Sequence, residues 1–307
     1  MSARRQQGVA LLVALLVVAL ATVLIAALLD SGQLALARTR NLLRGEQAQA
    51  YGRGLEAYAA QVLVDDAANG QLDTNDDIWA VPLPPTDVTG GTISATMRDM
   101  NGCFNLNNLV DADGQRQKVW MDRFGRLLEN LQLSPAIAEV AADWIDRDQD
   151  ASQGGAEDPV YLGRQPAYRS AGHGFADVSE LRLLDGVDAH AYALLAPWVC
   201  ALPTQTALNI NTAGIPLLRS LAPDITEAVA AQLHAKGHAH WNSVHAAMSV
   251  LQRAGVRVDP ADKAGLGVSS EYFVARARIT LDGIDYDYRS LIQRRSGIRV
   301  LARQRGL

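Results

Sequence analysis

The sequence predicts an α+β fold in which a long N-terminal helix and an antiparallel sheet accompany a large all-α stretch. Three observations carry this prediction. An uncharged apolar run occupies residues 9–29, segments with strand-like patterns lie at residues 91–100 and again after residue 270, and residues 111–267 between them have a mainly helical pattern. Strands on both sides of a helical block fit either an insertion into one sheet or two consecutive domains.

Residues 9–29 form the first element, a run without charged residues that predicts a membrane-spanning helix. At about 1.5 Å per residue it matches the roughly 30 Å hydrocarbon core of a bilayer. A cleaved secretory signal is the alternative, since Ala35 and Ala37 offer a cleavage site, but the run is longer than such signals have. Arg4 and Arg5 favour a cytoplasmic N-terminus, which places the body of the chain outside the cytoplasm.

The same helix is expected to continue past the membrane to about residue 64. No proline occurs before Pro82, and Tyr51, Leu55, Tyr58 and Val62 recur at helical spacing, which places them on one face. We therefore expect the first half of the helix in lipid and the second half packed on the rest of the chain.

The chain is acidic and carries two cysteines. Its formal net charge is −5, and removal of residues 1–8, which include two arginines, leaves 26 basic against 33 acidic residues, or −7. This balance argues against a nucleic-acid partner. Cys103 and Cys200 predict one disulfide in an oxidising compartment, with two separate thiols as the alternative. Neither has a second Cys within four residues, so a zinc site is not expected.

A short basic leader that ends in Gly8, followed by a smooth apolar stretch and an amphipathic helix, resembles the type IV prepilin family. The resemblance implies that a membrane-bound peptidase cuts between Gly8 and Val9 and that the new N-terminus is methylated. It also implies Glu at the fifth mature position, where this chain has Val13. In this departure the chain resembles one group of the family, the K-type minor pseudopilins of type II secretion systems.

Asp99 begins a segment that is similar to the D-x-x-G-x-x-N-L-N-N-L signature of the K-type minor pseudopilins and that ends at Leu109. It overlaps the end of the predicted strand at residues 91–100. Further strands are expected at residues 270–281, 284–292 and 298–302, with Asp282-Gly283 as a turn between the first two.

The resemblance favours a type IV pilin-like core with a helical insertion over two consecutive domains. It implies a leader at residues 1–8, a transmembrane helix at residues 9–29, a pseudopilin core at residues 30–110 and 268–307, and an inserted helical domain with a calcium loop at residues 111–267.

An acidic loop carries the clearest chemistry. With Asp146 counted as position 1, Asp148, Asp150 and Glu157 stand at positions 3, 5 and 12. Carboxylates at alternate positions of a tight loop converge on one hard cation. The glycine of an EF-hand is missing at position 6, and Pro159 prevents the loop from continuing at once into a helix. The pattern therefore indicates a calcium-type loop that is not an EF-hand.

The resemblance implies calcium at the same place, through D-W-I-D and G-G-x-E-D motifs. The predicted ligands of this structural ion are Asp143, Asp146, Asp148, Asp150, Glu157 and Asp158. A solvated acidic loop is the alternative. The shorter runs at residues 73–77 and 111–113 are interpreted as ordinary Asx-turns.

Other patterns favour structural interpretations. Residues 184–188 and 209–213 resemble the starts of helix-hairpin-helix units, but Asp188 replaces the glycine that approaches phosphate, so packing or protein contacts are expected rather than DNA binding. The histidines lack an H-E-x-x-H pattern and are interpreted as surface or cap residues; they are His234, His238, His240 and His245. No hydrolase, P-loop or dinucleotide motif is present, so no enzyme activity is expected.

By resemblance, the sequence predicts a minor pseudopilin that initiates and caps the periplasmic pseudopilus of a type II secretion system. The expected partners are the I and J subunits, the pseudopilus, the inner-membrane secretion platform, the prepilin peptidase and the lipid membrane. The expected location is the bacterial inner membrane, with a single span and a periplasmic body. The alternatives are a membrane-anchored enzyme or calcium-dependent binding module, and a DNA-uptake receptor built on the hairpin units.

Overall fold

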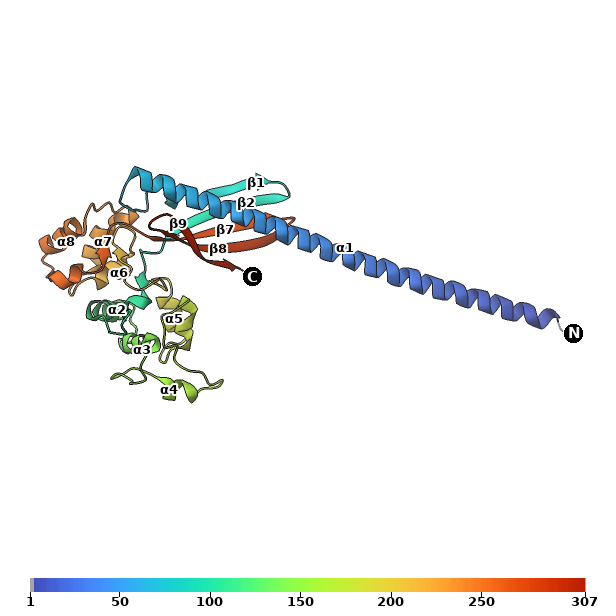
Figure 1. Cartoon of the computed structure of the whole chain (residues 1–307), viewed down its shortest axis with the longest axis horizontal. Coiled ribbons are helices and arrows are strands. Elements are labelled where there is room, and N and C mark those ends of the chain that lie inside the picture. The colour runs from blue at the N-terminus through green and yellow to red at the C-terminus, as the bar shows by residue number, and fades with distance from the viewer. Residues whose placement is uncertain (1–2, 307) are drawn as a thin grey trace.

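The chain forms a long rod with a sheet and a group of helices at one end (Figure 1). The computed structural model describes the backbone of residues 3–306 and the side chains of residues 9–306, so residues 1 and 2 of the predicted leader lie outside the described residues. Helix α1 is the rod, the sheet lies along its C-terminal half, and the remaining helices gather at the end far from the N-terminus (Figure 1).

The helices are α1 (Ala3–Asn69), α2 (Lys118–Asn130), α3 (Ala136–Ile145), α4 (Asp158–Leu162), α5 (Ala189–Leu195), α6 (Ile215–Ser220), α7 (Glu227–His234) and α8 (Val244–Arg253). The strands are β1 (Leu83–Val88), β2 (Gly91–Asp99), β3 (Phe104–Asn105), β4 (Val199–Cys200), β5 (Leu208–Asn209), β6 (Leu266–Gly267), β7 (Tyr272–Leu281), β8 (Ile284–Arg294) and β9 (Ile298–Arg305). Short 3-10 helices lie at Ile78–Ala80, Leu106–Asn108, Val178–Leu183, Ala235–Gly237 and Pro260–Lys263.

Helix α1 is longer than the sequence predicted. It has 67 residues, or about 100 Å at 1.5 Å per residue, and it ends at Asn69 rather than near residue 64. The side chains of Gln61 and Asn69 both bond to Asp65 one turn away, and the first residue outside the helix is Gly70. Its most apolar 18-residue window has a mean hydropathy of 3.1 and is 0% buried, so α1 is long and apolar enough to be a single membrane anchor.

The main sheet is antiparallel throughout, in the order β1-β2-β7-β8-β9. Strand β2 pairs with β7 along its whole length, from Gly91 opposite Leu281 to Asp99 opposite Phe273. These two neighbours are separated in sequence by all the helices from α2 to α8. The helical stretch is therefore an insertion between adjacent strands of one sheet, as the fold-class prediction required. The predicted domain boundaries at residues 110 and 268 stay a prediction.

Strand β1 was not predicted. Its sequence includes Pro84 and Pro85, which cannot donate to a sheet ladder. The strand lies at the edge of the sheet, and its register shifts between Leu83 and Thr86, so the prolines fall where the pairing with β2 is interrupted. The other strand predictions agree with β2, β7, β8 and β9 to within three residues at each end.

The second half of α1 packs on one face of the sheet. Gly52 approaches the sheet closely, since a Cβ added there would lie 3.2 Å from the ring of Tyr288 on β8. One turn on, the carboxylate of Glu56 accepts hydrogen bonds from the Ser290 hydroxyl at 2.7 Å and from Arg303 Nε on β9 at 2.8 Å. Contacts on two strands, β8 and β9, therefore fix the direction in which α1 leaves the body.

The inserted helices have a continuous apolar core of their own, which includes a stacked pair of Phe104 and Phe124 with ring centroids 4.9 Å apart. A smaller cluster joins this domain to the sheet. In it the disulfide between Cys103 and Cys200 lies among Tyr272 and Val274 of β7 and other apolar residues. The predicted disulfide is confirmed, and it closes the entrance of the insertion onto a residue 97 positions later.

Candidate functional site

Three of the six predicted metal ligands converge in the inserted domain. Asp143 lies in the last turn of α3, Asp146 caps the C-terminus of α3, and Glu157 directly precedes α4. One carboxylate oxygen from each lies within 4.8 Å of the others. Their exposed fractions are 0%, 4% and 1%. The loop of residues 147–156 therefore folds the end of α3 against the start of α4 and buries three acids at one point.

Arg116, from the segment before α2, neutralises part of this charge. Its guanidinium donates to Asp143, to Glu139 at 2.5 Å and to Asp146 at 3.4 Å. Asp143, Asp146 and Glu157 are buried, so one positive charge accompanies three buried carboxylates and leaves a formal balance of −2. Burying uncompensated charge is costly, so the cluster needs protons or a further cation.

The pKa values of the acids report the same imbalance. Burial, followed by the neighbouring carboxylate of Asp148, raises the pKa of Asp146 to about 6. Burial raises the pKa of Glu157 to about 7, against the hydrogen bond from the Ser170 hydroxyl and with the help of Asp146. In addition, Oδ1 of Asp146 and Oε1 of Glu157 are buried without a hydrogen-bond partner among the described residues.

These residues fit a hard divalent cation. The donors are carboxylate oxygens, the ligand type that calcium prefers, and two of them have buried lone pairs free to bind. The turn is also shaped closely around the acids. A Cβ on Gly155 would overlap the carboxylate of Asp143, and the Ser152 hydroxyl donates to that carboxylate at 2.6 Å. The turn thus holds Asp143 in place and leaves Asp146 and Glu157 to receive an ion.

The other three predicted ligands lie at the rim. Asp148 and Asp150 are exposed, and Asp148 accepts the backbone N–H of Asp150 at 2.9 Å. Asp158 is half-buried, accepts the backbone N–H of Ser170 at 3.0 Å and forms an ion pair with Arg169 at 3.3 Å. None of the three belongs to the converging group.

Sequence reasoning missed the residues that support the group. Arg116 and Ser170 carry no local signal, since each comes from a segment outside the acidic loop and meets the acids only through folding. Glu139 lies one turn before Asp143 on α3 and shares the same guanidinium. Ser152 and Gly155 lie inside the loop, and the Gly-Gly pair was the available sign of a close approach.

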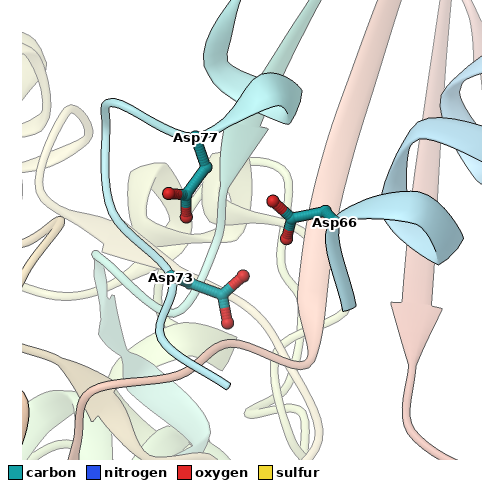
Figure 2. Close-up of side chains that lie close together, drawn as sticks. All are labelled: Asp66, Asp73 and Asp77. Atoms are coloured by element: carbon teal, nitrogen blue, oxygen red, sulfur yellow. The ribbon is translucent and has the colours of Figure 1, made fainter. Parts of the chain in front are cut away.

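A second group of acids converges where α1 ends. Figure 2 shows Asp66 on α1, Asp73 on the following loop and Asp77 before the first 3-10 helix, with their carboxylates facing a common space. Arg294 of β8 occupies this place: it forms ion pairs with Asp66 at 2.8 Å and with Asp73. Asp77 accepts from the Thr74 backbone at 2.7 Å, and none of the three acids has an unpartnered buried oxygen among the described residues. The ion pairs of this group therefore join the end of α1 to the sheet.

The asparagine-rich signature also has a structural role. The side chain of Asn105 accepts from the Leu202 N–H at 3.0 Å, and that of Asn107 accepts from the Phe175 N–H at 2.6 Å. Asn101 accepts from the backbone N–H of Tyr272 at 2.9 Å, which ties the start of the insertion to β7. Backbone groups of distant loops thereby find partners inside the domain instead of water.

Buried Asp99 is the centre of the same network. It accepts hydrogen bonds from the backbone of Asn101 at 2.7 Å, from the Ser270 hydroxyl at 2.7 Å, from Asn209 at 3.2 Å and from the hydroxyl of Thr212. Burial raises its pKa even so. Residues 209–213, which resembled the start of a second hairpin unit, thus supply two of the hydrogen bonds to this acid.

The first hairpin-like segment and the histidines behave as structural elements as well. Asp188 accepts the Ala191 N–H at 2.7 Å and so caps α5. His238 and His240 are exposed and bond to opposite oxygens of Asp76 at 2.6 and 2.7 Å, which joins the connection between α7 and α8 to the loop after α1. His234 is the last residue of α7, and His245 lies in the first turn of α8.

The predicted processing site lies in the helical rod. Gly8 falls within the described backbone of α1, and Val9, the next residue, is 61% exposed at the start of the apolar run.

Comparisons with known proteins agree on one family. Two family models, both described as type II secretion system protein K, match residues 102–204 and 208–269. A protein of that name from Klebsiella pneumoniae is 37% identical over 305 residues, which cover 94% of this chain and 93% of that protein. A second, from Pseudomonas aeruginosa, is 40% identical over 233 residues, covering 71% of this chain and 68% of that one.

A solved structure extends the agreement to the fold. It is the crystal structure of the GspK-GspI-GspJ complex from the type 2 secretion system of enterotoxigenic Escherichia coli. A chain in it matches this one with a TM-score of 0.78 and 30% identity, over 88% of this chain and 99% of that chain. Together these findings confirm the family resemblance that the apolar helix and the asparagine-rich signature indicated. The chain belongs to the type II secretion system protein K family, and it is a minor pseudopilin.

Proposed function

We propose that this chain assembles with the I- and J-type minor pseudopilins to initiate and cap the pseudopilus of a type II secretion system. The observation that carries the proposal is the match to a chain of the GspK-GspI-GspJ complex with a TM-score of 0.78. The body works in the periplasm, anchored by α1 in the inner membrane, and the chain contacts the prepilin peptidase and the secretion platform there.

The position of the inserted helices supports a place at the tip. They gather beyond the end of the sheet that is farthest from the N-terminus of α1 (Figure 1). In a filament each subunit repeats the contacts of the one before, and a head-to-tail interface needs both ends of the subunit free. A bulky domain on the membrane-distal end obstructs the next subunit above but leaves the lower side free, as a terminal subunit requires.

Processing by the prepilin peptidase is part of the proposal. The enzyme cuts between Gly8 and Val9 and methylates the new N-terminus. The support is the sequence itself: a basic leader, Gly8 and the uncharged residues 9–29. Val13 in place of Glu removes a charge that a subunit within the shaft would use, which agrees with a terminal position.

Calcium has a structural role in this proposal. Asp143, Asp146 and Glu157 would hold the ion, with Asp148, Asp150 and Asp158 near enough in sequence to add ligands directly or through water. The cation supplies the positive charge that the buried acids lack and so stabilises the fold of residues 146–158. The protein's own work is assembly, and we propose no catalytic step.

Affinity purification from membranes tests the assignment. The full chain, tagged at the C-terminus, is expressed in a type II-secreting bacterium that lacks its own K subunit, and the copurified proteins and the mature N-terminus are identified by mass spectrometry. We expect the I and J subunits, a methylated Val9 and restored secretion into the medium. A Gly8→Val variant is the control and should keep the leader and fail to restore secretion. Recovery of neither subunit, or an N-terminus near Arg38, would refute the proposal.

A further inference from the structure

The outer face of the sheet, opposite α1, carries an elongated groove. Two adjoining hollows of about 670 Å³ and 260 Å³ share Arg276, Arg289 and Gln304 in their linings. The first runs over β2, β7, β8 and β9, and the second continues to the junction with the inserted domain near Asp177. We call the two together the outer groove. This face is distinct from the one on which α1 packs, because the residues on either side of Arg276, Ala275 and Ala277, belong to the clusters under α1.

Three arginines from three neighbouring strands face the groove. Arg276 on β7 is the direct cross-strand partner of Arg289 on β8. Arg98 on β2 is diagonal to Arg276, since Arg98 pairs with Val274 and Thr96 with Arg276. Like charges directly opposite in a sheet repel, so this arrangement costs stability in the free protein. We call these residues the arginine triad.

The triad has no acidic partner within the body. Among residues 9–306, none of its members lies within 4.0 Å of a carboxylate oxygen. The two acids in the groove form other contacts: Asp287 pairs with Arg278 at 2.9 Å, and Asp177 accepts the Ser179 N–H at 2.9 Å. Burial acts to raise the pKa of Asp177, but the hydrogen bonds from Ser179 and the more distant charge of Arg289 lower it.

The outer groove is therefore a basic patch on an acidic protein. Apart from Arg305, its lining contains four arginines and two aspartates, a formal balance of +2, whereas the chain as a whole carries −5. The four arginines are Arg98, Arg276, Arg278 and Arg289. The guanidinium of Arg305 lies over the rings of Tyr286 and Tyr288, on the face toward α1, and is not counted. A local excess of one sign in a hollow attracts ligands of the opposite sign and favours their orientation.

We propose that the outer groove binds an extended acidic segment of a partner polypeptide. Side chains on one face of an extended chain recur about every 7 Å, and Arg276 and Arg278, two residues apart on β7, have that spacing. The triad spreads its charge over three strands, which suits several carboxylates along a chain rather than one small anion. Guanidinium groups also bind carboxylates in paired hydrogen bonds, which gives the site a preference for such a segment.

Membrane headgroups are a poorer fit because of their distance. The end of the sheet nearest the span is the turn at Asp282, which pairs with Arg44 on α1 at 2.7 Å. Arg44 lies fifteen residues past residue 29, where the apolar run ends, and this corresponds to about 22 Å of helix. The triad lies farther still along β7 and β8 from that turn.

Binding to the full chain in detergent micelles tests the inference. The probe is a fluorescent ten-residue peptide in which Glu alternates with Thr, and the matched peptide has Gln in place of Glu. Fluorescence anisotropy should show binding of the acidic peptide that weakens as salt rises, and no binding of the neutral one. The double variant Arg276→Gln, Arg289→Gln should weaken binding about tenfold, while Arg257→Gln, Arg299→Gln, which removes two exposed arginines elsewhere, should leave it within about twofold.

Thermal unfolding of the same variants separates binding from folding. Relief of the repulsion between Arg276 and Arg289 should leave the unfolding midpoint of the double variant unchanged or higher. The inference is overturned if the acidic peptide does not bind, if it binds both double variants equally, or if the neutral peptide binds as well. Three other anions are tested in the same way: vesicles with 30% phosphatidylglycerol, inorganic polyphosphate and a 20-nucleotide DNA strand. If one of them binds more tightly than the peptide, with the same dependence on Arg276 and Arg289, the inference is overturned in favour of that anion.

Discussion

Arg116 donates a hydrogen bond to the buried carboxylate of Asp143 from a segment 27 residues earlier in the chain. The same guanidinium serves Glu139 and Asp146. A single positive charge is thereby shared among three acids that lie far from Arg116 in the sequence. This sharing leaves Glu157 without a cation, and it is the reason why a divalent ion is expected to stabilise the inserted domain.

Calcium should raise the thermal stability of the detergent-solubilised chain. At a hundred times its dissociation constant, the ion adds about 2.7 kcal/mol, or roughly 5–10 °C in the unfolding midpoint for a body of this size. Glu157→Gln should remove most of the increase, because it replaces a buried anionic ligand. Asp122→Asn, an exposed acid of α2 paired with Lys118, is the control. Equal calcium shifts in both variants would show that the ion binds elsewhere.

Glycines two residues apart on α1 should respond in opposite ways to alanine. Gly52→Ala places a Cβ 3.2 Å from the Tyr288 ring and should destabilise the body by about 1–3 kcal/mol. Gly54→Ala meets nothing within 4 Å and should stabilise it by up to about 1 kcal/mol through helix propensity. Urea unfolding followed by tryptophan fluorescence measures both, and equal effects of the two changes would contradict the packing of α1 on β8.

The contact of Glu56 with Ser290 and Arg303 should make stability depend on pH. Burial raises the pKa of Glu56, but the hydrogen bonds from Arg303 and Ser290 outweigh it, and the pKa lies below its usual 4.5. The charged form is thus favoured in the folded state, so its contribution is present above about pH 5 and is lost as pH falls through the lowered pKa.

Glu56→Gln should therefore cost about 1 kcal/mol at pH 7. The difference from the unchanged chain should shrink as pH falls through the lowered pKa of Glu56 and disappear once Glu56 is protonated. Unfolding midpoints measured from pH 7 to pH 3 give this comparison. A difference that stayed constant over this range would show that the charge of Glu56 does not contribute.

Reduction of the disulfide should loosen the junction between the insertion and the sheet. Cys103 and Cys200 are 97 residues apart, and cross-links over such loops contribute about 2–5 kcal/mol. Dithiothreitol should lower the unfolding midpoint of the chain, and the double variant Cys103→Ala, Cys200→Ala should start low and not respond. An unchanged midpoint on reduction would contradict this role.

Most of the pilin-like core was predictable because its signals are local. The apolar run of residues 9–29 predicts a helix, and the alternating segments after residue 270 predict strands, from the hydrophobic pattern of each segment alone. Strand β1 was missed, since Pro84 and Pro85 argue against a strand and only the edge position and the shifted register accommodate them. The end of α1 was placed early for a related reason: nothing in residues 65–69 breaks a helix, but the hydrophobic periodicity had ended.

The candidate metal centre was predictable in part. The sequence places Asp146 and Glu157 in one loop, and the resemblance adds Asp143. The sequence could not show which of the six acids converge, because this depends on which side chains turn inward between α3 and α4. Asp148 and Asp150 lie in the same loop as the buried acids Asp146 and Glu157, yet their side chains remain exposed.

The sequence by itself determined the long apolar helix, the cysteine pair and the family. Each of these depends on neighbouring residues or on a short known pattern. Tertiary structure alone decided how Arg116 meets Asp143, how Arg294 joins the end of α1 to β8, and how Arg98, Arg276 and Arg289 come to one groove. Those contacts join residues from distant parts of the chain, and electrostatic energy depends on distance in space, which strand register and helix packing set.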